Sequence, residues 1–131
     1  MCDPIKPRRT RVEHHCYILK DRQPVKCKDE AFWAHWYAHG DNRVVAVDDI
    51  AEYRLSTAFL GLNAARKGDV PAWFETVLFR DGEVMPAARV YATWQKAFDG
   101  HRRIEELLRK QLKEAQTLAD DWINDMLKAT R

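Results

Sequence analysis

Residues 73–79 read Trp-Phe-Glu-Thr-Val-Leu-Phe, an apolar run interrupted by one threonine and one carboxylate. In an extended strand, alternate side chains point to opposite faces of the sheet. Glu75 therefore shares a face with the apolar side chains of Trp73, Val77 and Phe79. A carboxylate on an apolar face loses hydration and needs a cation or hydrogen-bond donors. Glu75 is thus a candidate acid, an ion-pair partner, or an edge residue that reaches water.

The composition predicts one folded domain. The 131 residues are 46% hydrophobic, 11% aromatic and 32% charged, with a net charge of +2. Residues 1–28 carry eight Lys and Arg against three acidic residues, a net charge of +5, which leaves −3 for the rest. The first 13 residues are expected to form a flexible basic arm, in which Arg8, Arg9 and Arg11 can bind nucleic acid or an acidic protein surface.

Strand and turn signals predict an antiparallel meander, since the connections are too short for crossover helices. Asp81-Gly82 is a hairpin-turn signal. Asp48 and Asp49, with Glu52, are expected to form an acidic corner rather than a metal site. The expected strands are residues 14–20, 42–47, 53–62, 73–79 and 88–92, with a turn at 21–23 after the first.

Two helices are expected. Asp29 is a candidate N-cap of a short helix, and Gly40 stands where a left-handed C-cap is expected. Thr93 is the candidate N-cap of a long C-terminal helix, in which Gly100 is expected to allow a kink. The fold class is therefore α+β, with a four- or five-stranded antiparallel sheet, one short helix and one long helix.

An apolar heptad seam follows Gly100. Its positions step by four and three residues, which is typical of helices that pair. Either the helix breaks near Gly100 and folds back, or its distal part projects from about residue 101 and pairs with another chain. We favour pairing with a host protein or with a second copy. The seam consists of Leu108, Leu112, Ala115, Ala119, Trp122 and Met126.

Three segments, residues 56–62, 74–79 and 91–101, together carry a resemblance. In order they read STAFLGL, FETVLF and YATWQKAFDGH. This order resembles a family of small uncharacterised bacteriophage and prophage proteins, with the patterns S-T-x-F-L-G-L, F-E-T-x-x-F and Y-x-T-W-x-x-A-x-x-G-H. The likeness covers about residues 15–101 and departs from the family in the loop at 63–67. It implies a phage or mobile-element origin.

Other polar residues support no catalytic or metal site by themselves. His35 and His39 are spaced like metal ligands on a helix, but no third ligand is evident, and we interpret them as a wet helix face. The group of His14, His15, Cys16 and Cys27 matches no zinc module. Ser56 and Thr57 lack an evident base and the glycine-rich elbow that exposes a nucleophile. We expect no metal and no cofactor, and the three cysteines fit reduced thiols.

Glu75 and His101 are the remaining candidates for chemistry. If they lie close together, a Glu–His pair can transfer protons. Alternatively, Glu75 pairs with Arg54 or Arg89, and His101 joins the helix to the sheet. We favour the structural interpretation over an enzyme.

The functional expectation is a phage-encoded accessory protein that acts by protein–protein binding, with a host antiviral defence system as a candidate target. Nucleic-acid binding by the arm and a small enzyme using Glu75 and His101 are the alternatives. The chain contains no run of eighteen apolar residues and no secretory signal at its start, so we expect a cytoplasmic location and no membrane partner.

Overall fold

The structure is a computed structural model that describes residues 16–65 and 69–130. The chain forms two compact units, the first ending at His101 and the second beginning at Arg102. The predicted basic arm, including Arg8, Arg9 and Arg11, and the pair His14 and His15 lie outside the described residues.

The first strand pair is a hairpin of β1 (Tyr17–Lys20) and β2 (Gln23–Lys26). Residues 14–20 were expected to form one strand, and β2 was not expected. Asp21 and Arg22 make the turn with left-handed φ of 49° and 66°, which confirms the turn predicted at residues 21–23. Pro24 is tolerated in β2 because this strand pairs only with β1.

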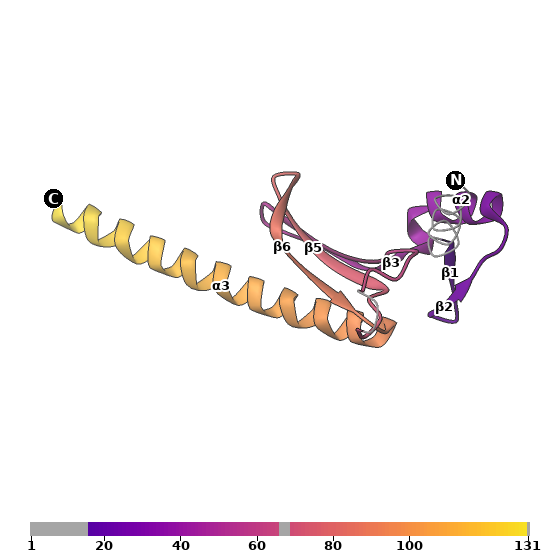
Figure 1. The fold of residues 1–131 in the computed structure, drawn as a ribbon. Coiled ribbons are helices and arrows are strands. Elements are labelled where there is room, and N and C mark those ends of the chain that lie inside the picture. Colours follow the sequence, from indigo (N-terminus) through magenta and orange to yellow (C-terminus); the bar gives the residue numbers. More distant parts are fainter. Residues whose placement is uncertain (1–15, 66–68, 131) are drawn as a thin grey trace, which may run out of the picture. The chain divides into compact units, whose positions relative to one another are not determined.

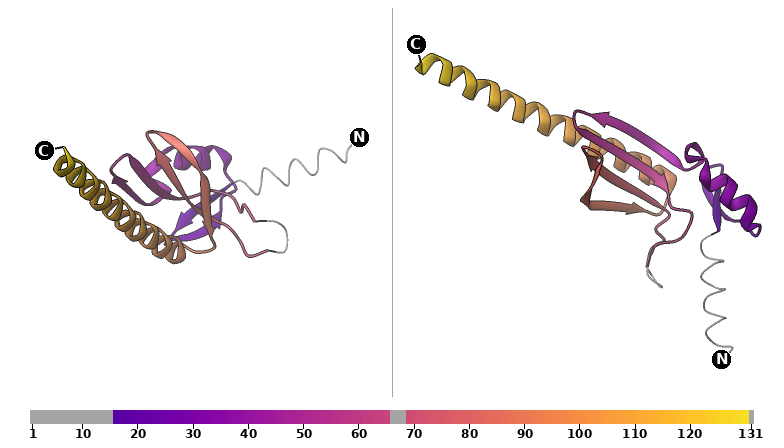
Figure 2. Two further views of the ribbon diagram at one scale, coloured as in Figure 1. Left: turned by 90° about the vertical axis from the view of Figure 1, so that its left-hand side faces the viewer. Right: turned by 90° about the horizontal axis from the view of Figure 1, so that it is seen from above.

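The main sheet is an antiparallel meander in the order β3-β4-β5-β6, which confirms the α+β prediction (Figure 1). Tight hairpins join β3 to β4 and β5 to β6, whereas residues 60–73 join β4 to β5. Figure 2 shows the same four strands from two further directions. The strands are β3 (Val44–Ile50), β4 (Tyr53–Phe59), β5 (Phe74–Arg80) and β6 (Glu83–Tyr91).

Three predicted boundaries in this sheet were wrong. The strand predicted at 53–62 ends at Phe59. Asp48 and Asp49 do not form a corner, because both lie within β3 and pair with Leu55 and Arg54 of β4. The turn follows instead at residues 51–52, where Ala51 has φ of 54°. The last strand is also longer than the predicted 88–92, since β6 is an edge strand and accepts a proline in its middle.

Residues alternate between two faces of this sheet. The inner face is buried and includes Leu55, Thr57, Phe59, Phe74 and Thr76. The outer face is half-buried or exposed and includes Asp49, Arg54, Ser56, Ala58, Glu75, Val77 and Phe79.

The short helix α2 (Glu30–Ala38) begins as predicted, because the Asp29 carboxylate accepts a hydrogen bond from the Phe32 N–H. The predicted left-handed cap at Gly40 was wrong. Helix α2 ends at the extended residue His39, and Gly40 begins the short 3₁₀ helix η1 (Gly40–Asn42). Trp33 ties α2 to the hairpin by donating its indole N–H to the Tyr17 carbonyl at 2.8 Å.

The long helix α3 (Trp94–Ala129) is a single helix, so the less favoured alternative of a break and fold-back near Gly100 was wrong. Its start was predicted correctly, since the Thr93 hydroxyl accepts a hydrogen bond from the Lys96 N–H. Gly100 instead allows the Tyr91 side chain to pack closely against the helix backbone. A Cβ atom there would lie 2.6 Å from the Tyr91 hydroxyl oxygen, and closer still to a ring carbon.

The core of the first unit is aromatic. Phe59, Phe74 and Ala97 are buried, which places the first turns of α3 against the inner face of the sheet. Half-buried residues from every part of the unit surround them: Tyr17, Leu19, Trp36, Val45, Trp73, Tyr91 and Trp94.

Candidate functional site

Glu75 and His101 do not meet. Glu75 pairs in register with Ala58 on the outer face, whereas His101 contacts Thr57, the preceding residue of β4, on the inner face. The proposed proton-transfer pair is therefore separated by the thickness of the sheet. The expected pair with Arg54 does not form either, because Arg54 binds Asp49. Among the described residues, the half-buried Glu75 side chain forms no hydrogen bond and no ion pair.

His101 instead belongs to a polar chain inside the first unit. Its Nε2 donates to the Asp48 carboxylate at 2.7 Å, and its Nδ1 lies 2.8 Å from the Thr57 hydroxyl. That hydroxyl is hydrogen-bonded to the Thr76 hydroxyl, which lies 3.1 Å from the Tyr91 hydroxyl. This series of hydrogen bonds links β3, β4, β5, β6 and α3.

Asp48, His101 and Thr57 have the connectivity of a carboxylate, a base and a hydroxyl nucleophile. No base for Thr57 was evident in the sequence, and the structure supplies His101 from 44 positions away. However, the exposed fraction of both Thr57 and His101 is 0%. A nucleophile must reach its substrate, so this arrangement is a structural hydrogen-bond network. Thr57 and Thr76 lie at matching positions of adjacent strands, and this match is visible only once the strand register is known.

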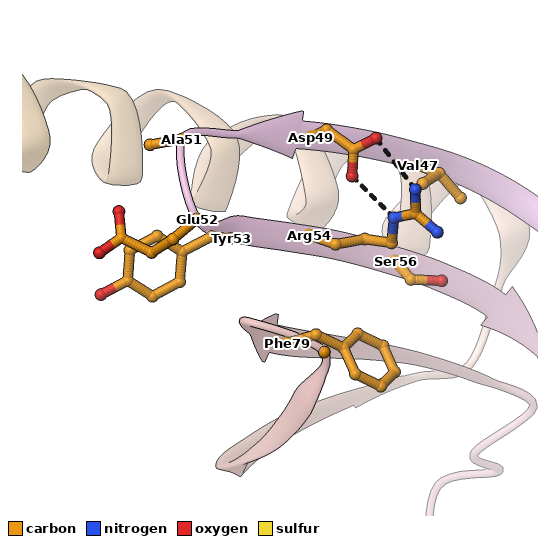
Figure 3. Close-up of a pocket in the computed structure, with 9 residues that line it drawn as sticks. Val47, Asp49, Ala51, Glu52, Tyr53, Arg54, Ser56 and Phe79 are labelled. Atoms are coloured by element: carbon orange, nitrogen blue, oxygen red, sulfur yellow. Dashed lines mark hydrogen bonds and ion pairs between the residues drawn. The ribbon is translucent and has the colours of Figure 1, made fainter.

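A hollow of about 610 Å³ lies at the end of the sheet where the hairpin turns meet (Figure 3). In its lining the Arg54 guanidinium donates to both Asp49 oxygens, at 2.7 and 3.0 Å. This contact lowers the pKa of Asp49 and raises the pKa of Arg54. The hollow is lined by Val47, Asp49, Ala51, Glu52, Tyr53, Arg54, Ser56, Phe79 and Gly82.

The charges around this hollow are largely paired. Beside the Asp49–Arg54 pair, Arg80 lies 3.6 Å from the Glu52 carboxylate and over the Tyr53 ring. The backbone of Glu52 also accepts a hydrogen bond from the Asp81 N–H, which joins the two hairpin turns. Because each cation faces an acidic partner, the hollow presents no concentrated charge to a ligand. It contains neither a nucleophile beside a base nor a cluster of carboxylates.

The residues with ligand-like spacing do not assemble into a metal site. Within residues 16–65 and 69–130, no three His, Cys, Asp or Glu side chains gather as a metal site would require. The His35 and His39 rings lie 4.7 Å apart, but the His39 Nδ1 is hydrogen-bonded to the His35 carbonyl. Cys16 is buried, and this burial raises the pKa of its thiol, with smaller contributions from Glu30 and Cys27. Both described cysteines are free thiols.

The C-terminal seam is the most exposed apolar feature of the second unit. Leu108 and Leu112 are half-buried, whereas Ala115, Ala119, Trp122 and Met126 are exposed. Three further side chains that the strict heptad pattern missed widen the stripe: Leu118, Ile123 and Leu127. A helical wheel of the full apolar set would have found them, because they flank the seam at helical spacing.

Comparison with known proteins identifies no relative: no family model, no curated protein and no solved structure matches the chain. In the part of the chain that the structure describes, no helix combines the length and the apolar composition needed to cross a bilayer.

Proposed function

We propose that this protein acts by binding another polypeptide through the apolar stripe of its C-terminal helix. The observation that carries the proposal is the exposure of large apolar side chains on one helix. Trp122 is 65% exposed and Leu118 70% exposed. Ile123, Met126 and Leu127 lie in the same stripe and are 43%, 44% and 58% exposed.

Such a stripe is costly to leave in water. Each large apolar side chain gains about 1.5–3 kcal/mol on full burial. A contiguous apolar patch on a folded protein commonly marks an interaction site. Tryptophan is also among the residues that contribute most to binding when they fill a pocket on a partner. The amphipathic helix is the form in which many such segments enter a groove or pair with another helix.

We further propose that the protein is a phage or mobile-element accessory factor that acts in the cytoplasm of the host, with an antiviral defence system as its candidate target. The support is the resemblance of residues 56–62, 74–79 and 91–101 to phage and prophage proteins, together with small size and the binding stripe. This part of the proposal rests on similarity of pattern rather than on geometry.

The binding proposal is tested by affinity capture with two matched variants, from bacterial lysate that also contains an untagged copy of this chain. Trp122→Glu places a charge in the stripe, whereas Asn124→Glu places the same charge on the opposite face of the same helix turn. We expect one protein to be retained by the wild type and by Asn124→Glu, and to be lost with Trp122→Glu. Equal retention by both variants would contradict binding through the stripe.

Nuclease treatment of the lysate separates the nucleic-acid alternative. Binding through the basic arm depends on counterion release, so it weakens steeply as salt rises. Retention that disappears after nuclease treatment, and is unaffected by Trp122→Glu, would assign the activity to the arm. The enzymatic alternative has no geometric support, because Glu75 and His101 lie on opposite faces of the sheet.

The biological role is tested by phage plating on bacteria that carry individual defence systems. Expression of the wild type is expected to restore plating on at least one protected strain. The Trp122→Glu variant should fail to restore it, and Asn124→Glu should retain the effect. If no tested strain responds while capture succeeds, the partner lies outside defence.

A further inference from the structure

The second unit has an asymmetric charge distribution along its axis. Residues 102–113, here called the basic half, carry five Lys and Arg against two Glu, a net charge of +3. Residues 114–129, here called the acidic half, carry four Asp and Glu against one Lys, a net charge of −3. Two halves of equal and opposite charge therefore follow each other on one helix.

Internal ion pairs leave much of this charge available. In the basic half, Arg102 and Arg109 both bind Glu105, at 3.3 and 3.1 Å. Arg103 lies 4.0 Å from Glu106, and among the described residues Lys110 and Lys113 form no ion pair. In the acidic half, the carboxylates of Glu114, Asp121 and Asp125 likewise form no ion pair with a described residue.

We propose that the stripe binds a second copy of this chain, with the two C-terminal helices antiparallel. This inference rests on the proposed function, since it names the partner of the same stripe. In an antiparallel pair the acidic half of each copy lies alongside the basic half of the other, and the two helix dipoles are opposed. Arg109 and Asp125 flank the seam, whereas Lys110, Lys113, Glu114 and Asp121 lie on the outer face of the helix. A parallel pair brings like halves together, which is unfavourable within the Debye length of about 8 Å at physiological salt.

The apolar seam fits the same orientation. Reading Leu108, Ala115 and Trp122 as heptad d positions makes Leu112, Ala119 and Met126 the a positions. An antiparallel pair centred on Thr117 then brings a and d positions of the two copies together in every layer. Leu108 faces Met126, Leu112 faces Trp122, and Ala115 faces Ala119.

The layers are complementary in size. The two small alanine layers lie at the centre, where the helices can approach closely, and large side chains fill the layers on both sides. Leu118, which is 70% exposed, flanks the centre and meets its own copy across the two-fold axis. A parallel pair would instead place the Trp122 indoles against each other in a single layer.

Sedimentation equilibrium of the full chain at micromolar concentration tests the self-pairing. We expect the wild type and Asn124→Glu to be dimers, and Trp122→Glu to be a monomer with an unchanged circular dichroism spectrum. A monomeric wild type would overturn the inference. The proposed function would survive that result if lysate capture still depended on Trp122, so the two failures are distinguishable.

A charge-inverted variant tests the orientation. It changes the net charge of the basic half from +3 to −3 and that of the acidic half from −3 to +3. The six substitutions are Arg109→Glu, Lys110→Glu, Lys113→Glu, Glu114→Lys, Asp121→Lys and Asp125→Lys. This variant should form its own dimer. Mixed with the wild type and analysed by native mass spectrometry, it should form far fewer mixed dimers than the statistical share of about one half. An excess of mixed dimers would show a parallel pair and overturn the antiparallel assignment.

Discussion

His101 donates to the Asp48 carboxylate at 2.7 Å, although 53 positions separate the two residues in the chain. This contact joins the second turn of α3 to the edge strand β3. The exposed fraction of His101 is 0%, whereas the Asp48 side chain is 28% exposed. The pair is therefore the outer end of a buried polar network.

Loss of His101 should destabilise the fold strongly. His101→Ala leaves a cavity and removes the partners of Asp48 and Thr57, so we expect a loss of about 3 kcal/mol in unfolding free energy. Asp48→Asn keeps an acceptor oxygen and should cost less, about 1 kcal/mol. Urea denaturation followed by tryptophan fluorescence measures both. The exposed neighbour Lys96→Ala is the control, and a His101→Ala variant as stable as this control would contradict the structural role.

Glu75 should be dispensable for stability, whereas the next residue should not. Glu75→Gln removes a charge that has no partner among the described residues, so its effect should stay within about 0.5 kcal/mol. Thr76→Val removes a buried hydroxyl from the network and should cost about 1–3 kcal/mol. The same denaturation experiment compares them. A large loss of stability in Glu75→Gln would mean that this carboxylate has a structural partner.

Gly100→Ala should destabilise the protein although alanine favours a helix by about 1 kcal/mol over glycine. The added methyl group would overlap the Tyr91 ring. In a Tyr91→Ala background the overlap is absent, and the same substitution should become neutral or stabilising. A double-mutant cycle measured by thermal denaturation isolates this coupling. Additive effects would show that Tyr91 does not approach Gly100.

The Asp49 carboxyl should titrate below the usual range for aspartate, because Arg54 hydrogen-bonds to its charged form. A lowered folded-state pKa contributes stability above the unfolded-state pKa, and this contribution disappears as the pH falls through the lowered value. Carboxyl ¹³C NMR titration measures the shift directly. Arg54→Met should return the pKa of Asp49 toward its ordinary value, and an unchanged titration would contradict the pairing.

The sequence by itself determined the local elements. Alternation predicted the strands, Asp29 and Thr93 predicted two helix starts, and Asp81-Gly82 predicted a hairpin, because each depends on neighbours in the chain. The apolar stripe of the C-terminal helix was also readable, since its spacing is a property of the helix alone. The turn after β1 was predicted at residues 21–23 and lies at Asp21-Arg22. The turn at Ala51 was predicted two residues too early, because alanine seldom adopts a left-handed φ.

Only the tertiary structure decided the roles of the polar residues. Glu75 and Thr76 are adjacent in sequence, yet the strand places one on the outer face and the other in the buried network. The register aligns Thr57 with Thr76, and α3 brings His101 onto both strands. Hydrogen bonding across a sheet depends on which strand pairs with which and in what register, and no local pattern in WFETVLF specifies that.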